Sequence, residues 1–414
     1  MKIAIIGSGI SGLVCGHLLH RDFDISIFEA NDYVGGHTHT IDVTTDRSTY
    51  AVDTGFIVFN RTTYPNFCKL IGQLGVDSQP TGMNFSVRSE KTGMEYGSES
   101  VSTLFAQRKN ILSPSYWRMV SEIFKLRRHL VTYINSAEPD MPMSEFLASR
   151  NYSQRFIDHF VVPLGASLWS AEPGKILEFP ARTFGRFFEN HGFLQATNPI
   201  QWRVIAGGSK QYVNKITEPF ADKIYRATPV TSVHRTEDYV ELEFANRDKI
   251  RFNQVIFATH SDQALKILAD PTKDERTILG AVPYQANDTI LHTDETVLPQ
   301  NRRAWSSWNY AILQDQIDRA AVTYNMNMLQ SIKAEETFCV SLNMKHRIAE
   351  AKILGQYLYH HPVYLEDSII AQKSHGVISG HNRTHYCGAY WGYGFHEDGV
   401  KSGLEVAHYF GKSL

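Results

Sequence analysis

The hydrophobic positions at the start of the chain predict a strand, a helix and a second strand in close succession. Residues 2–6 form a short apolar run typical of a buried strand, followed by a glycine-rich turn and a helical run to about His20. Residues 24–28 predict a second strand, which ends at Glu29. This order is a βαβ unit in its shortest form.

Apolar and polar positions divide the rest of the chain into regions of different character. Residues 224–259 alternate or run apolar between turn residues, which predicts several strands. Residues 101–190 have a mostly helical pattern, residues 283–345 mix strands and loops with many aromatic residues, and a glycine-rich tail begins at Gly380. No repeat or low-complexity linker separates these regions in the sequence. We therefore expect two domains whose segments interleave along the chain.

The turn after the first strand carries the pattern Gly7-x-Gly9-x-x-Gly12 and opens the helix with Ile10 and Ser11. Gly7 permits the tight turn, Gly9 lets the backbone approach a pyrophosphate, and Gly12 lets the helix pack closely on the strand. The helix N-terminus offers free amides to phosphate groups. Glu29 stands 20 residues beyond Gly9 and can accept hydrogen bonds from both ribose hydroxyls. The pattern predicts a dinucleotide site and disfavours NADP, because Glu29 would repel a 2′-phosphate.

A second glycine pair extends this fingerprint beyond what an NAD enzyme needs. Gly35-Gly36 follows the acid and is itself followed by His37-Thr38-His39. This arrangement resembles the FAD signature of the flavin amine oxidase and phytoene desaturase superfamily. Most of its members have an arginine where this chain has His37, so the backbone role is kept while the side-chain contact differs. Asp53-Thr54-Gly55-Phe56 also resembles the family segment that runs close to the flavin ring.

The C-terminal region resembles the part of the same superfamily that closes the FAD site. A strand, a glycine-rich turn with Gly392 and Gly394, and a helix follow one another, and Glu397 or Asp398 can cap that helix. The helix amides would face the flavin edge on which negative charge develops on reduction. The strand at 255–259 and the turn Gly207-Gly208-Ser209 are similar to further family segments.

The resemblance implies an FAD cofactor held without a covalent bond. Some members attach the flavin through a cysteine in the region before the closing strand, and no cysteine lies between Cys339 and Cys387. We expect these residues to contact FAD: Gly7, Gly9, Ile10, Ser11, Gly12, Glu29, Ala30, Gly35, Gly36, His37, Thr38, Thr54, Gly55, Val230, Phe395, Asp398, Gly399 and Val400.

The predicted fold class is α/β, with a Rossmann-like FAD-binding domain and an interleaved α+β substrate domain of mixed antiparallel sheet plus helices. We assign residues 1–75, 200–268 and 380–414 to the FAD-binding domain. Residues 76–199 and 269–379 form the predicted substrate domain. A basic amphipathic segment occupies residues 100–134 of the latter.

Catalytic residues are less clearly marked in the sequence. Amine oxidases of the superfamily place two aromatic rings above the flavin, and one of these positions coincides with Phe395, while the other should fall near Tyr357 or Tyr359. His396 lies inside the closing turn, and a histidine near a flavin can act as a base. We therefore predict Phe395, Tyr359 and His396 as catalytic residues. The pair His37-x-His39 lacks carboxylate or cysteine company, so we predict no metal site.

Composition and charge narrow the possible partners and compartment. The 414 residues carry a net charge of −2, which gives no indication of nucleic-acid binding. Four widely spaced cysteines favour a reduced cytoplasm over a disulfide framework. Residues 100–134 contain six basic residues and several large apolar residues but only one acidic residue, Glu122. That pattern suits either a protein resting on an anionic bilayer or a helix with an apolar core stripe and a solvated basic face.

Three segments together resemble one bacterial subgroup, whose flavoproteins are associated with cyclopropane-synthase-like methyltransferases: 35–39, 305–310 and 390–399. Some members desaturate methylated acyl chains of phospholipids. The resemblance implies an FAD-dependent oxidoreductase of this type, in the cytoplasm or at the inner face of the membrane, with a lipid substrate and a methyltransferase partner. The alternatives are an amine oxidase for a small amine or polyamine, a reduced-flavin isomerase or mutase, and a non-catalytic flavin-binding partner of a methyltransferase.

Overall fold

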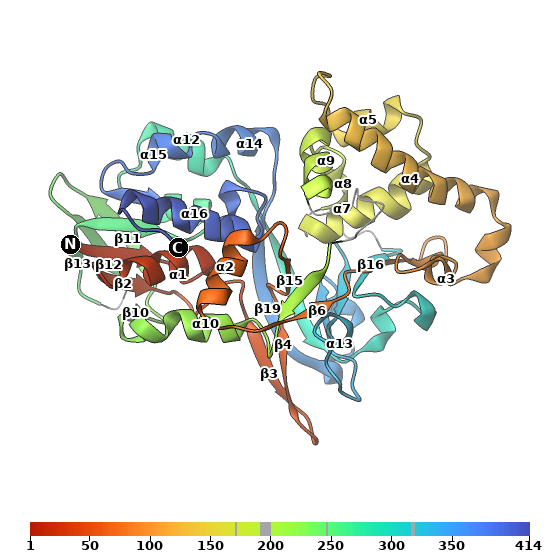
Figure 1. The fold of residues 1–414 in the computed structure, drawn as a ribbon, viewed down its shortest axis with the longest axis horizontal. Coiled ribbons are helices and arrows are strands. Elements are labelled where there is room, and N and C mark those ends of the chain that lie inside the picture. Colours follow the sequence, from red (N-terminus) through yellow and green to blue (C-terminus); the bar gives the residue numbers. More distant parts are fainter. Residues whose placement is uncertain (170–171, 191–199, 246, 316–318) are drawn as a thin grey trace.

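The computed structural model of the protein describes residues 1–169, 172–190, 200–245, 247–315 and 319–414 (Figure 1). A five-stranded parallel sheet forms the centre of the half that contains both termini. Its order is β10-β2-β1-β14-β20, and its strands are β1 (Lys2–Ile6), β2 (Asp24–Phe28), β10 (Ile224–Tyr225), β14 (Gln254–Phe257) and β20 (Thr384–Tyr386). Distant segments of the chain thus meet in one sheet.

Both faces of this sheet are buried, which explains the nearly continuous apolar run of β1. Ile3 and Ile5 face a cluster with α1 (Ile10–Leu19) and α16 (His396–Tyr409). Ala4 and Ile6 face the opposite cluster. That cluster is built by β11 (Val230–Arg235), β12 (Val240–Phe244), β13 (Ile250–Phe252), α11 (Ser261–Ile267), α12 (Lys273–Gly280), α14 (Glu366–Gln372) and α15 (His375–Ile378). The predicted α/β fold class is confirmed by this layered arrangement.

A seven-stranded mixed sheet forms the centre of the second half. Its order is β19-β15-β18-β17-β16-β7-β8, and all neighbouring pairs are antiparallel except β16 with β7. The strands are β7 (Phe85–Ser89), β8 (Glu95–Gly97), β15 (Tyr284–His292), β16 (Trp308–Ile312), β17 (Val322–Asn325), β18 (Cys339–Leu342) and β19 (Ile353–Pro362). In Figure 1, β15 and β19 lie toward the half that contains the termini.

Helices from residues 101–190 pack beyond this sheet, as the helical pattern predicts. They are α3 (Val101–Leu104), α4 (Pro114–Ile134), α5 (Met143–Ser149), α6 (Gln154–Phe156), α7 (Val162–Trp169), α8 (Pro173–Ile176) and α9 (Ala181–Asn190), with a 3-10 helix η1 (Arg108–Leu112) and a π-helix η2 (Ile157–Val161). Figure 1 places α3 and the start of α4 at the end of the molecule farthest from the termini.

Smaller elements connect the two halves. A hairpin pairs β3 (Thr40–Thr44) with β4 (Thr49–Asp53), and a three-stranded sheet joins β5 (Val58–Asn60), β9 (Trp202–Ile205) and β6 (Ser78–Thr81). The remaining elements are α2 (Pro65–Gln73), α10 (Lys210–Thr217), α13 (Met326–Leu329), and the short turns η3 (Glu218–Lys223), η4 (Glu295–Val297), η5 (Arg302–Ala304), η6 (Lys345–Arg347), η7 (Glu350–Lys352) and η8 (Ala389–Trp391).

Candidate functional site

The turn between β1 and α1 forms a cradle in which two of the three glycines leave no room for a side chain. A Cβ at Gly7, whose φ is +101°, would lie 2.6 Å from the Ala258 carbonyl oxygen, and one at Gly12 would lie 2.2 Å from the Gly7 oxygen. A Cβ at Gly9 meets nothing within 4 Å. The outer two glycines are therefore required by packing, whereas Gly9 opens onto free space where a pyrophosphate can approach the backbone.

Glu29 is buried at the carboxyl end of β2 and is held firmly in place. Its Oε2 accepts hydrogen bonds from the Ser8 amide at 3.0 Å, and its Oε1 accepts one from the Asn31 amide at 2.9 Å. The Thr228 amide donates to the Glu29 carbonyl at 2.8 Å, which brings the start of β11 and Val230 to this edge. This is the position expected for the acid that recognises ribose hydroxyls. Ala30 follows it at the surface.

The second glycine pair lies directly on the first turn. Gly35 and Gly9 form an isolated bridge, and a Cβ on Gly36 would stand 3.1 Å from the Gly9 Cα. Both Gly35 and Gly36 have positive φ, at 126° and 60°. Next to them, the Thr38 hydroxyl is 2.5 Å from the Tyr212 hydroxyl of α10. The predicted extension of the fingerprint is thus part of the same cradle.

His37 points into a group of aromatic rings. Its ring centroid lies 5.2 Å from that of Tyr359, 5.3 Å from that of His361 and 5.8 Å from that of His260. Within the described part of the chain, its buried Nε2 finds no hydrogen-bond partner. Burial lowers the pKa of His37 to about 4, so the imidazole is neutral and can donate one hydrogen bond. A neutral donor at this position fits a polar cofactor group.

The segment Asp53–Phe56 packs against the backbone of His37. The Phe56 amide donates to the His37 carbonyl at 2.7 Å, and a Cβ on Gly55 would lie 2.0 Å from the same oxygen. Asp53 is fully buried and accepts hydrogen bonds from the Ser209 amide at 2.9 Å and from Gln330 Nε2 at 3.0 Å. These bonds tie the segment to the Gly207-Gly208-Ser209 turn, so the two stretches that resemble the family are in contact.

The C-terminal half of the site meets the N-terminal half at the starts of two helices. Gly399 packs so closely on α1 that a Cβ would lie 2.6 Å from Cγ2 of Ile10 and 3.2 Å from the Ser11 hydroxyl. Val400 is buried in the same cluster as Ile10. Because α1 begins at Ile10 and α16 at His396, both N-termini lie in this region and their amides can face one anionic cofactor.

Two acids of the closing turn have different roles. Asp398 Oδ2 accepts hydrogen bonds from the Tyr393 amide at 3.0 Å and the Phe395 amide at 3.1 Å, so it holds the turn that starts α16. Burial raises the pKa of Asp398 to about 6. Glu397 instead accepts hydrogen bonds from the Asn66 and Phe67 amides and caps α2. Of the two candidate caps for α16, Asp398 is the one that serves it.

The three predicted catalytic residues make different contacts. Phe395 stacks on Phe187 of α9 with ring centroids 5.0 Å apart. Tyr359 makes hydrogen bonds to Thr54 Oγ1 at 2.8 Å and to His39 Nδ1 at 2.9 Å. These partners place Phe395 beside the helical part and Tyr359 beside the β3–β5 segment.

His396 is enclosed among side chains below the closing turn. Its ring stacks on Phe56 at 3.6 Å, and its Nε2 lies 2.7 Å from the Tyr212 hydroxyl. Burial lowers the pKa of His396 to about 3, so the ring is neutral. These contacts favour a supporting role over direct proton transfer, and the assignment of His396 as catalytic stays a prediction.

Sequence reasoning missed several polar groups at the site. The buried Tyr364 hydroxyl has no partner within the described residues and sits where a Cβ on Gly394 would be 2.7 Å away. His260 and His361 join the ring group around His37, and burial lowers the pKa of each to about 3. Of these residues, the sequence indicates only His361, which stands with His360 in the predicted substrate region. Tyr364 follows β19 and His361 lies near its end, and neither has a fixed sequence spacing to the glycines.

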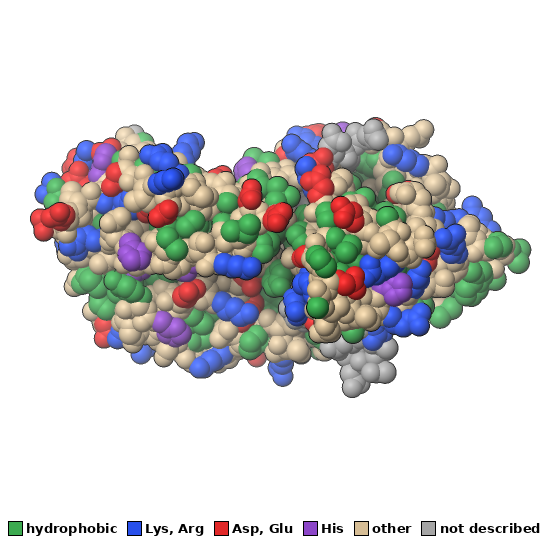
Figure 2. Space-filling model, turned by 90° about the horizontal axis from the view of Figure 1, so that it is seen from above, with side chains coloured by type: hydrophobic (Ala, Val, Ile, Leu, Met, Phe, Trp, Pro, Cys, Tyr) green, Lys and Arg blue, Asp and Glu red, His purple; other side chains and the backbone are tan. Residues whose placement is uncertain are grey.

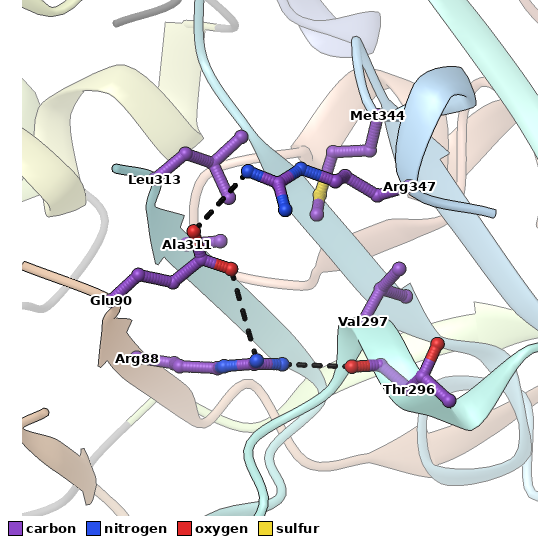
Figure 3. A pocket seen from close by; sticks show the side chains of 8 residues that line it. All are labelled: Arg88, Glu90, Thr296, Val297, Ala311, Leu313, Met344 and Arg347. Carbon is purple, nitrogen blue, oxygen red and sulfur yellow. Dashed lines mark hydrogen bonds and ion pairs between the residues drawn. The ribbon is translucent and has the colours of Figure 1, made fainter. Parts of the chain in front are cut away.

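A separate pocket lies in the seven-stranded sheet and takes no part in this site. The pocket has a volume of about 160 Å³. Figure 3 shows its lining, which includes Arg88, Glu90 and Arg347. Arg88 Nη1 donates to the Thr296 carbonyl at 2.8 Å, and Arg347 pairs with Glu90 at 3.3 Å. Its charged groups therefore satisfy one another.

The glycine cradle, the buried acid and the two converging helix starts define an FAD-dependent oxidoreductase with non-covalently bound cofactor. The chain belongs to the flavin containing amine oxidoreductase family, whose model matches residues 10–323. It is 22% identical over 411 residues to amine oxidase [flavin-containing] A of Bos taurus, covering 90% of this chain and 73% of the relative.

Solved structures share the fold over nearly the whole chain. A putrescine oxidase variant superposes with a TM-score of 0.70 at 13% identity, covering 98% of both chains. A fatty acid isomerase from P. acnes that produces CLA superposes with a TM-score of 0.69 at 15% identity, covering 99% of this chain and 98% of the other. At this identity the likeness establishes the fold and leaves the substrate open.

Two further properties bear on the predicted partners. Across the described ranges, no helix is both long and apolar enough to cross a membrane. In the same part of the chain, no group of three or more His, Cys, Asp and Glu residues could hold a metal ion.

Proposed function

We propose that the protein desaturates a methylated fatty-acyl chain of a membrane phospholipid by hydride transfer to flavin N5. The observation that carries this proposal is the stacking of Phe395 on Phe187, because this contact joins the closing turn to the large apolar cluster that includes the helices of residues 101–190. A substrate that approaches from this side meets aromatic rings, which favours an acyl chain. The existence of a fatty acid isomerase with the same fold supports the choice.

The bound FAD supplies the acceptor for two electrons and one hydrogen nucleus of the broken allylic C–H bond. The chain's own residues hold the substrate and exclude water. Phe395 and Phe187 would grip the acyl chain, and Asp398 fixes the Phe395 backbone through its amide. The partnerless Tyr364 hydroxyl, whose pKa is raised by burial, stays protonated and offers a hydrogen bond beside Gly394.

A hydrogen-bonded chain offers a path for the proton that must leave the neighbouring carbon. Tyr359 Oη lies between Thr54 Oγ1, 2.8 Å away, and His39 Nδ1, 2.9 Å away. Tyr359 can take the substrate proton on its oxygen as its own proton passes to His39. His39 is partly exposed, and its pKa is lowered by burial, so it can release the proton to water. One C=C bond then forms as two C–H bonds break.

The test uses purified holoprotein under anaerobic conditions and a phospholipid with a methylated, monounsaturated acyl chain. Bleaching of the flavin absorbance with formation of a diene is the expected result, and a saturated, unmethylated lipid serves as the control. A methylated lipid that causes neither bleaching nor diene formation would overturn the proposal. Such a lipid would come from a methyltransferase acting on the same membrane, and the reaction would take place at its cytoplasmic face.

An amine oxidase is the second candidate, favoured by the family match and by the bovine relative. A panel of small amines and polyamines in the same anaerobic assay separates the two, since bleaching by an amine alone would favour this alternative. Activity that needs prior dithionite reduction without net oxidation would indicate an isomerase or mutase. Tight FAD binding and complex formation with a methyltransferase, without reduction by any substrate, would indicate a non-catalytic partner.

A further inference from the structure

Exposed apolar side chains are concentrated in one part of the molecule. The described residues expose twelve large hydrophobic side chains, and six of them fall within residues 101–131: Val101, Ile111, Leu112, Trp117, Phe124 and Val131. Leu112 is 87% exposed and Phe124 is 64% exposed. Single exposed apolar residues are ordinary, but a group of this size on one surface indicates a contact with something apolar.

The helix α4 explains how these residues come to share a surface. Trp117, Phe124 and Val131 are seven residues apart, just under two helical turns, so they form one row along the exposed side. The opposite side, with residues such as Met119, Leu126 and Leu130, is buried in the core. One side of α4 therefore packs into the core, as expected for a helix with an apolar core stripe. A second apolar row, Trp117, Phe124 and Val131, lies on the exposed side.

The loop before α4 is fixed to the helix. The Trp117 indole nitrogen donates to the Ile111 carbonyl at 2.8 Å, and its ring lies 4.8 Å from that of Phe105. These contacts present Ile111 and Leu112 beside Trp117 at the start of the helix. Figure 2 shows hydrophobic side chains, with lysine and arginine next to them, at the same end of the molecule that carries α3 in Figure 1.

The charges around the apolar row are almost all positive. The only acid in residues 100–134, Glu122, is buried and is bound by Arg118 and by the Ser153 hydroxyl. The side chains of Lys109, Arg127 and Arg128 make no hydrogen bond or ion pair with any described residue, and Lys109 and Arg128 are exposed. A chain with an overall charge of −2 thus presents a locally cationic surface here.

We propose that this α4 surface, formed by Ile111, Leu112, Trp117, Phe124, Val131, Lys109, Arg127 and Arg128, docks the protein on an anionic lipid bilayer. Apolar side chains would enter the headgroup boundary as the cations meet the lipid charge, which is how a peripheral helix binds a membrane without crossing it. The cations would make a second copy of this chain a poor occupant, because the same charges would then face each other.

The surface is also connected to the flavin site through one helix. A Cβ on Gly185 of α9 would lie 2.6 Å from Cγ2 of Ile134 of α4, so the two helices pack closely. Two residues further on, Phe187 stacks on Phe395 of the closing turn. Docking on α4 therefore brings the aromatic side of the site near the lipid. The docking itself rests on the α4 surface alone and does not depend on the proposed reaction.

The test is flotation of holoprotein with phosphatidylcholine vesicles that contain or lack phosphatidylglycerol. We expect binding only to the anionic vesicles, and weaker binding as salt increases. The variant Leu112→Ser/Phe124→Ser should bind about tenfold more weakly or worse, because two apolar side chains no longer leave water. The matched control, Ile370→Ser/Val377→Ser, removes side chains 57% and 54% exposed on α14 and α15 and should bind as the wild type does.

Three results would overturn the inference. The first is no binding of wild-type holoprotein to anionic vesicles. The second is equal binding of the wild type and Leu112→Ser/Phe124→Ser. The third is concentration-dependent dimerisation in analytical ultracentrifugation that this variant abolishes, which would make the surface an interface between copies. Flavin content and melting temperature show that each variant is folded, and vesicle binding without diene formation would leave docking intact while ending the desaturase proposal.

Discussion

Replacement of Gly9 by alanine separates cofactor binding from folding. Gly9 has φ −66° and ψ 174°, which alanine adopts readily, and the added methyl group meets no protein atom within 4 Å. Loss of glycine from the start of α1 lowers the free energy of unfolding by about 0.5–1 kcal/mol. The lower conformational entropy of the unfolded Ala chain raises it by about 0.4–1 kcal/mol. The free energy of unfolding of the apoprotein should therefore stay within about 1 kcal/mol of wild type.

The effect on FAD should be much larger. The methyl group would occupy the space through which a pyrophosphate approaches the backbone, and overpacking of this kind costs about 1–3 kcal/mol. The dissociation constant of FAD should then rise about 5- to 150-fold. At an FAD concentration about a hundred times the wild-type Kd, FAD stabilises the wild type by about 2.7 kcal/mol, and Gly9→Ala should keep only about 0.3–1.8 kcal/mol of this gain.

The assay is denaturant unfolding of apoprotein with and without FAD, together with a fluorescence titration of FAD. Gly7→Ala is the matched comparison, because its positive φ alone costs about 1–3 kcal/mol and its Cβ would also overlap Ala258, 2.6 Å away. Gly7→Ala should destabilise the apoprotein, whereas Gly9→Ala should not. Wild-type FAD affinity in Gly9→Ala would refute the placement of the pyrophosphate at this turn.

Four further predictions concern polar groups. Burial raises the pKa of Asp53 from 3.8 to about 6, so the protonated carboxyl stabilises the fold fully below pH 3.8 and this stabilisation is lost as the pH rises through 6. The free energy of unfolding should fall by up to about 3 kcal/mol over this range. In urea titrations, Asp53→Asn should make the free energy of unfolding less dependent on pH. Glu397→Ala should lower the free energy of unfolding in urea by about 2–3 kcal/mol, because two α2 amides lose their acceptor. Glu405→Ala, at an exposed position of α16, should lower it little, and equal losses would contradict the capping role of Glu397. Tyr359→Phe should keep FAD affinity but lower kcat about a hundredfold and change the pH profile of kcat, and an unaltered pH profile would refute the proton path. Tyr364→Phe should leave the free energy of unfolding unchanged or higher, because the Tyr364 hydroxyl has no partner among the described residues.

The cofactor half of the protein is predictable because its requirements are local. The turn from Gly7 to Gly12 lies between a strand and a helix that the sequence shows clearly, and backbone sterics leave little choice of residue. Glu29 is equally local, because it comes directly after the last residue of the next strand, β2. The interleaving of 224–257 and 384–386 into one sheet could be expected in outline, since no linker separates these regions, but the strand order required the structure.

The substrate half is less predictable because its contacts are between distant segments. Phe187 and Phe395 are 208 positions apart, and no local pattern shows that α9 turns its rings toward the closing turn. The chemical environment of His396 is likewise set by Phe56 and Tyr212 rather than by its neighbours in sequence. A histidine inside a flavin-closing turn suggests a base, yet burial makes this one neutral and engages its Nε2.

The way the two halves of the flavin site meet has a consequence for folding. A Cβ on Gly399 or Gly403 of α16 would lie 2.6 Å from Ile10 or 2.8 Å from the Ser11 carbonyl of α1, so the two helices approach almost backbone to backbone. The cradle is therefore complete only when residues close to both ends of the chain have come together. FAD should bind the finished fold far better than any partly folded state, and through mass action it should stabilise contacts along most of the chain. Residues such as Phe187, which the proposed function places against the substrate, lie outside this junction, so they can change without disturbing it.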